Sequence, residues 1–210
     1  MNGVATPARV GFWAGIAACA ATVAYDVVQI AQLLGVVHFP VDEILIFGTS
    51  LCIVVPFVLE VVALHHTTPT DRRFWTHAAL VFTTMYAVFG SANYVVQLAT
   101  VIPAKLRGVA EPVRLLEQTP HSLLWDFDAM AYLAMGVAAV LIVPALGDSR
   151  HERRVRWACI AHAVATMLAG VVYFYPTYSP QRLLLLGFPW AITAPLFMAL
   201  LANALRARAG

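Results

Sequence analysis

Six long runs of apolar residues, each long enough to cross a lipid bilayer, dominate this sequence. A spanning helix needs about 20 mainly apolar residues, because it crosses roughly 30 Å of hydrocarbon at about 1.5 Å per residue. Hydrophobic residues make up 61% of the 210-residue chain and charged residues 11%, which excludes an ordinary soluble enzyme. The sequence predicts an all-α, six-transmembrane-helix integral membrane bundle that forms one domain over residues 1–210. Its spans lie near residues 11–37, 44–64, 75–103, 126–146, 156–176 and 183–205.

The lysines and arginines predict how this bundle lies in the membrane. Of the 13 basic residues, nine fall at one end of the predicted spans and four at the other. Because cytoplasmic loops carry the excess of Lys and Arg, we expect both termini in the cytoplasm. The basic segment 150–156 is either such a topology signal or a site for lipid headgroups. Residues 104–125 form the long loop of the outer side, where we expect a lid.

The net charge and the cysteine content limit which partners and cofactors we expect. The formal net charge is only +2, which indicates no electrostatic field for nucleic acid. Cys19, Cys52 and Cys159 stand alone in apolar runs, which indicates neither a disulfide framework nor a zinc site. We therefore expect no metal and no cofactor. The expected partners are the lipid bilayer and a lipid-soluble small molecule.

Acidic and polar side chains interrupt the first, third and fourth runs toward their outer ends. An ionisable group at bilayer depth costs at least ~2.5–3.5 kcal/mol on insertion scales, so it indicates a functional site if it faces the bundle interior. Asn and Gln side chains at this depth can be explained by hydrogen bonds between helices. A carboxylate at this depth must instead pair with a cation or take up a proton. The candidate acids are Asp26, Asp126 and Asp128. The expected pocket also contains Tyr25, Gln29, Asn93, Tyr94, Gln97 and Trp125, with Phe127, Tyr132, Tyr173, Tyr175 and Tyr178 as further walls.

A second group of ionisable side chains lies toward the cytoplasmic side. Glu60 follows Pro56 by four residues, and the proline leaves the carbonyl of Cys52 without its helical donor. His162 enters the membrane from the same side in the fifth run. We expect Glu60 and His162 to form a coupled acid–base pair, or Glu60 to pair structurally with a histidine, since His77 also lies on this side. Two metal ligands are a further interpretation, although the spacing typical of zinc sites is absent.

The sixth run contains two prolines, Pro189 and Pro195, six residues apart. Such a helix kinks, and its freed carbonyls must be answered by Thr193 or by a neighbouring helix. The kink is either a packing feature or a broken helix that lines a cavity, with Trp190 at the break.

Three segments, 39–45, 118–128 and 185–195, resemble segments of a group of small bacterial polytopic membrane proteins of unassigned function. This resemblance implies a protein of a bacterial cytoplasmic (inner) membrane. The chain is also similar to the membrane-integral terpene cyclases of fungal meroterpenoid and bacterial indole-sesquiterpenoid pathways, which are small, helical and cofactor-free. Those proteins are thought to use a glutamate in an early span and an aspartate in a later one. The resemblance implies these roles for Glu60 and for Asp128 or Asp126.

We therefore expect a membrane-embedded enzyme that acts on a lipid-soluble isoprenoid, a cofactor-independent terpene cyclase. Protonating an alkene or epoxide needs a buried carboxylic acid, and the resulting carbocation needs aromatic faces within about 6 Å and no water. Asp128 or Glu60 would donate the first proton, and the other acid or a histidine would accept the last one. The donor would be oriented by Asp26, Asn93 and Gln97.

Two other functions fit the same residues. A proton-coupled small-solute transporter or channel also uses a titrating acid and a broken helix, and it predicts a water path from the outer cluster to Glu60. A non-catalytic lipid-binding membrane protein would keep its activity after Asp26→Asn, Glu60→Gln and Asp128→Asn.

Overall fold

A computed structural model describes residues 5–209 of the chain, and within this range all regular structure is helical. The six helices that are long and apolar enough to cross a membrane, as a membrane protein requires, correspond to the six predicted runs. They are α1 (Ala5–Leu33), α2 (Val41–Thr67), α3 (Arg73–Val96), α5 (Leu123–Ile142), α6 (Arg150–Phe174) and α7 (Pro180–Ala209). A π-helical turn (Gln97–Val101) joins α3 to the short α4 (Ile102–Leu106), so the third span is one continuous helical segment.

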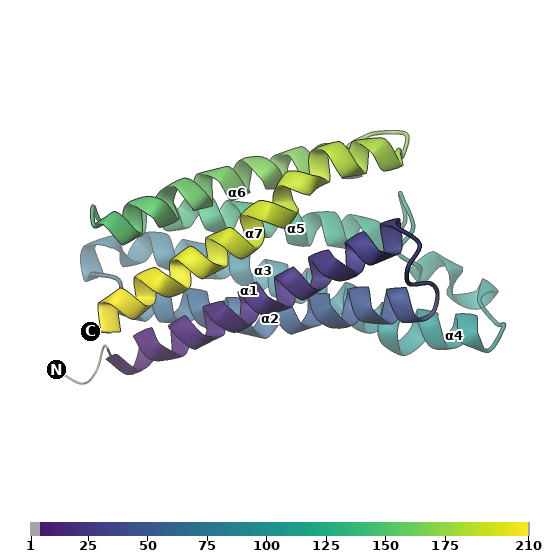
Figure 1. The fold of residues 1–210 in the computed structure, drawn as a ribbon, viewed down its shortest axis with the longest axis horizontal. Coiled ribbons are helices and arrows are strands. Elements are labelled where there is room, and N and C mark those ends of the chain that lie inside the picture. The colour runs from purple at the N-terminus through teal and green to yellow at the C-terminus, as the bar shows by residue number, and fades with distance from the viewer. Residues whose placement is uncertain (1–4, 210) are drawn as a thin grey trace.

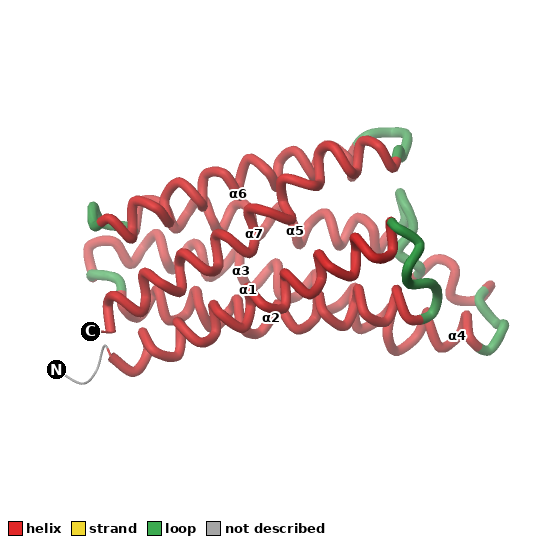
Figure 2. Tube along the Cα trace, in the orientation of Figure 1, coloured by secondary structure: helices red, strands yellow, loops and turns green. Residues whose placement is uncertain are grey.

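The six long helices form a closed ring. Each packs against the next long helix along the chain, and α7 returns to pack against α1. Figure 1 shows them as one elongated bundle in which the start of α1 and the end of α7 lie together. We call this the termini end of the bundle. The opposite end, which carries residues 107–122, is the loop end, and its long connection is visible in Figure 2.

Local signals set the helix ends, and these differ from the predicted spans by several residues. Helix α1 stops at Leu33, four residues before the predicted limit, because Gly35 adopts a φ of 66°. The amide of Val36 then donates to the carbonyl of Ala31 at 2.8 Å. Helix α5 begins at Leu123, because the Ser122 hydroxyl accepts the amide N–H of Trp125 at 3.2 Å.

Helix α7 is continuous, although it bends near its middle and diverges from α1 toward the loop end (Figure 1). The interpretation of a broken helix is therefore wrong, and the two prolines bend the helix without interrupting it. The Thr193 hydroxyl donates to the carbonyl of Pro189 at 2.9 Å. This is the usual bond of a helical threonine to the residue four positions earlier, and it does not answer a carbonyl freed by a proline.

An aromatic layer fills the middle of the bundle. The ring of Phe57 meets the rings of Tyr86 and Phe197 edge to face, with centroids 5.6 and 5.9 Å apart, and both phenylalanines are fully buried. On the termini side of this layer, α1 approaches α2 and α7 closely at Gly15. A Cβ atom there would overlap the carboxyl group of Glu60 and stand 2.8 Å from Cβ of Ala202.

Candidate functional site

Asp128 is the best-connected acid of the molecule. It is the sixth residue of α5, near the loop end, and only 4% of it is exposed. Its Oδ2 accepts hydrogen bonds from the Tyr173 hydroxyl at 2.5 Å and from Nε2 of Gln118 at 3.1 Å. Its Oδ1 accepts longer ones from the Tyr94 hydroxyl at 3.3 Å and Nδ2 of Asn93 at 3.4 Å. Among residues 5–209, no basic side chain pairs with it, so four neutral donors surround the carboxyl group.

Hydrogen bonds from the buried side-chain amides of Asn93 and Gln97 hold the 107–122 loop over Asp128. Nδ2 of Asn93 donates to Oε1 of Gln118 at 2.7 Å, and Nε2 of Gln97 donates to the carbonyl of Leu116 at 2.7 Å. The amide N–H of Gln118 returns a bond to Oε1 of Gln97 at 3.3 Å. The π-helical turn that starts at Gln97 is a feature often found at functional sites. Sequence reasoning missed Gln118, because a polar residue in a loop gives no signal by itself.

Two cavities meet at Asp128. One, of about 250 Å³, lies between α1, α2, α3, α5 and the 107–122 loop; the other, of about 240 Å³, lies between α1, α5, α6 and α7. Pockets for small molecules measure about 300–1,000 Å³, and each of the two cavities is slightly smaller than that. Both cavities are lined by Tyr25, Gln29, Gln118, Trp125, Asp128, Tyr132 and Leu183.

Aromatic rings wall the second cavity in a continuous chain. Ring centroids are 4.6 Å apart for Trp125 and Tyr173, 5.8 Å for Tyr173 and Tyr132, and 4.8 Å for Tyr132 and Trp190. Tyr25 continues the chain 6.0 Å from Trp190. The indole N–H groups of Trp125 and Trp190 are buried without a hydrogen-bond partner.

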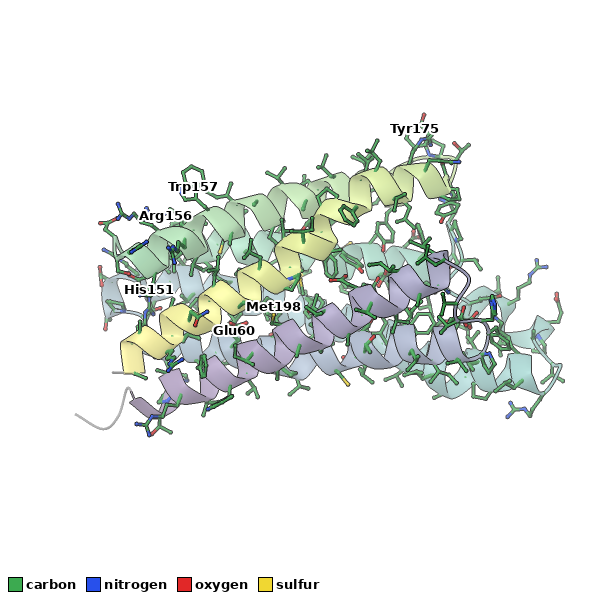
Figure 3. The ribbon with its side chains drawn as sticks, in the orientation of Figure 1. Glu60, His151, Arg156, Trp157, Tyr175 and Met198 are labelled. Atoms are coloured by element: carbon green, nitrogen blue, oxygen red, sulfur yellow. The ribbon has the colours of Figure 1, made fainter. Side chains whose placement is uncertain are left out.

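Two of the expected aromatic walls lie elsewhere. The ring of Phe127 packs against Phe89 on α3, with centroids 5.2 Å apart. The guanidinium of Arg182 lies 3.6 Å from the ring centre of Tyr175, which is exposed at the loop end (Figure 3). Neither residue lines the two cavities.

The second cavity opens sideways between α1 and α7. Its mouth is formed by Ile30 and Leu33 of α1 and by Leu184 and Phe188 of α7, which are each at least 50% exposed. Exposed apolar side chains on a spanning helix face lipid. These four residues lie in the halves of α1 and α7 nearer the loop end, where the two helices diverge in Figure 1.

The other two acids near the loop end, Asp26 and Asp126, differ from Asp128. Asp26 lines the second cavity near its mouth and is half-buried, but it makes no hydrogen bond to Asp128. Asp126 is exposed, because two residues along a helix turn a side chain to another face. Next to Asp26, Nε2 of Gln29 donates to the hydroxyl of Tyr25 at 2.8 Å, and that hydroxyl lies 3.3 Å from the hydroxyl of Tyr132.

Glu60 and His162 lie apart from both cavities. Both are fully buried, and neither carboxyl oxygen of Glu60 has a hydrogen-bond partner (Figure 3). Nδ1 of His162 lies 3.3 Å from the Thr193 hydroxyl, and its ring stacks on Phe197 at 5.5 Å. No hydrogen bond or ion pair joins Glu60 to His162, so the predicted pair is not formed. Within residues 5–209, no three His, Cys, Asp or Glu side chains are placed to hold a metal ion.

The arrangement of acid, rings and opening limits the chemistry of the site. Four neutral donors stabilise the carboxylate that remains when Asp128 gives up a proton. Aromatic faces stabilise a positive charge that forms beside them. Comparisons with protein-family models, curated proteins and solved structures found no match to this chain.

Proposed function

We propose that this chain is a membrane-embedded enzyme that acts on a lipid-soluble isoprenoid and uses Asp128 as its proton donor. The observation that carries the proposal is the place of Asp128, at the inner end of an aromatic cavity that opens sideways between α1 and α7. A substrate dissolved in the bilayer reaches such an acid without crossing water. The reaction needs no co-reactant.

The proposed reaction begins with Asp128 as a carboxylic acid. Its O–H bond breaks as the proton moves to a carbon of a substrate double bond, whose electron pair forms the new C–H bond. A tertiary carbocation and the Asp128 carboxylate remain, and the donors on Tyr173 and Gln118 stabilise the carboxylate. A second double bond of the substrate attacks the cation and closes a ring. Loss of a proton from a neighbouring carbon to Asp128 completes an isomerisation.

The walls of the cavity protect and stabilise the cation. The rings of Trp125, Tyr132, Tyr173 and Trp190 line the space beside Asp128. Hydrogen bonds from the side-chain amides of Asn93 and Gln97 hold the 107–122 loop over the cavity, and the loop limits access of water from the loop end. Glu60 and His162 take no part in the reaction, since neither lines a cavity.

The test is turnover by the purified protein. Prenylated and epoxidised isoprenoids are incubated with it in detergent or nanodiscs, and cyclic products are identified by mass spectrometry. We expect Asp128→Asn to abolish product formation and the exposed control Asp126→Asn to preserve it. Absence of product with every substrate, or equal activity of Asp128→Asn, overturns the proposal.

The packing of the interior supports an enzyme over a proton-coupled carrier. A carrier needs a path from the outer cluster to Glu60 in at least one state. From the cavities toward the termini end, a space of about 10 Å³ lies beside Tyr86 and Ile53, and the layer of Phe57 and Phe197 follows. Proton-driven uptake into proteoliposomes would instead support the carrier.

The proposal also includes the orientation of the bundle in the membrane and the identity of that membrane. The termini end carries nine arginines and the loop end Lys105 and three arginines, which favours a cytoplasmic termini end. The proposal of a bacterial cytoplasmic membrane rests on the resemblance of residues 39–45, 118–128 and 185–195 to small bacterial membrane proteins. Single cysteines introduced at Gly108 and at Arg208, in a cysteine-free background, test the orientation. A membrane-impermeant thiol reagent should label the first from outside the cell and the second only after the cells are opened; the reverse pattern contradicts it.

A further inference from the structure

We infer that the cavity at Asp128 is also a binding site for lipophilic ammonium ions, with the cationic nitrogen against the Asp128 carboxylate and an apolar tail in the mouth between α1 and α7. The inference rests on the proposed function in one respect, since an ammonium ion carries the charge of the proposed carbocation. The class of ligand, however, follows from three features of the cavity itself.

The first feature is an acid without a counter-charge. Asp128 is buried, and its four hydrogen-bond donors are all neutral. Neutral donors satisfy the oxygens of a carboxylate but leave its net charge in place, and a buried charge is costly unless it is paired. An ammonium ion supplies the missing positive charge.

The second feature is the set of rings around this acid. Tyr132 and Tyr173 lie side by side with centroids 5.8 Å apart, and Trp125 and Trp190 extend the wall on either side. Aromatic faces attract quaternary and tertiary ammonium groups, because the negative π faces contact the carbons that share the charge. A carboxylate beside such a wall therefore matches an alkylated ammonium better than an alkali-metal ion.

The third feature is the route to the site. The mouth is lined by Ile30, Leu33, Leu184 and Phe188, so the ligand must arrive with an apolar part. A neutral tertiary amine can travel through lipid and take the proton of Asp128 on arrival. The O–H bond of Asp128 breaks, an N–H bond forms, and an ammonium carboxylate pair results with no other reactant.

The test compares two ligands of the same shape. N,N-Dimethyldodecylamine and 2-methyltetradecane differ by a nitrogen in place of a CH group, and each is titrated into protein in nanodiscs, with empty nanodiscs subtracted. We expect the amine to bind at least about 30-fold more tightly, the ratio that corresponds to a desolvated cation–π contact of about 2 kcal/mol. Equal binding of the two ligands overturns the inference.

Variants locate the site. Asp128→Asn should remove the preference for the amine, whereas the exposed control Asp126→Asn should keep it. Trp190→Leu keeps the acid but removes one ring, and it should weaken amine binding several-fold more than alkane binding, because both ligands lose an apolar contact but only the amine loses a cation–π contact. Loss of the preference in Asp26→Asn with retention in Asp128→Asn would place the cation at the mouth and refute the assignment.

The two proposals fail separately. Amine binding that depends on Asp128, without cyclic products, supports the binding site and overturns the proposed enzyme. Cyclic products without a preference for the amine support the enzyme and overturn the binding site. Each purified variant is first checked for wild-type thermal unfolding, so that loss of binding is read only from folded protein.

Discussion

Replacing Glu60 with methionine removes a buried carboxyl group that has no hydrogen-bond partner, and we expect this change to stabilise the fold. Glu60 is fully buried, and both of its oxygens lack a partner. Its carboxyl group lies against Gly15, which has no side chain to offer it a hydrogen bond. A buried polar group left unpaired costs about 1–3 kcal/mol. Methionine is unbranched and fills an irregular space of similar volume, so a small packing loss leaves an expected gain of about 0.5–2 kcal/mol.

A matched control is Gln97→Met, which removes a polar side chain of similar shape that is equally buried but fully used. The amide of Gln97 bonds the carbonyl of Leu116 and the N–H of Gln118. Both backbone groups lose their partner in the variant, so we expect a loss of about 1–3 kcal/mol. The two substitutions to methionine should therefore change stability in opposite directions.

Unfolding in mixed micelles, followed by circular dichroism as the fraction of SDS rises, measures both free energies. Product formation from an isoprenoid substrate is measured in parallel, and Glu60→Met should keep the wild-type rate. A loss of more than about 1 kcal/mol in Glu60→Met would refute the reasoning, because it would mean that the carboxyl group makes stabilising bonds in the folded protein. Loss of activity in a Glu60→Met variant that remains stable would show that Glu60 takes part in the reaction.

Three further predictions follow from single contacts. Tyr173→Phe removes the 2.5 Å hydrogen bond to Asp128 and should lower the initial rate of product formation about 10- to 100-fold. Gly136→Ala places a Cβ atom 2.9 Å from Cβ of Thr166 and should lower the free energy of unfolding by about 1–3 kcal/mol in the same SDS titration. Arg208→Gln breaks the ion pair with Glu152, whose side chains are 17% and 16% exposed, and should cost about 1 kcal/mol; a double-mutant cycle with Glu152→Gln measures the coupling.

The spans were predictable from the sequence because bilayer thickness fixes their length. The gathering of Tyr25, Asn93, Gln97 and Trp125 near Asp128 was also predictable in part, since all lie at similar depth in their spans and polar groups turn toward the interior. Depth along a helix can be counted in the sequence at about 1.5 Å per residue.

The direction in which a side chain points around the bundle cannot be obtained by counting residues along the sequence. Helix α2, which carries Glu60, ends at the termini end, and α6, which carries His162, begins there, but the order of helices in the ring decides whether the two side chains face one another. The ring places Phe197 against the His162 imidazole and leaves Glu60 against α1, so the two do not meet. Gln118 escaped prediction for the related reason that a loop has no periodicity from which a facing residue can be inferred.

The comparison of Asp128 with Glu60 shows what a buried acid needs before it can transfer a proton. Both are acids without a basic partner in an apolar chain, and from the sequence they look equivalent. Asp128 has four donors to stabilise the carboxylate and a cavity for the molecule that takes the proton. Glu60 has neither a donor nor a space beside it. Loss of a proton from Glu60 would leave an uncompensated charge in a dry interior, so the donors and the cavity around Asp128, rather than burial, are what identify it as the acid of the site.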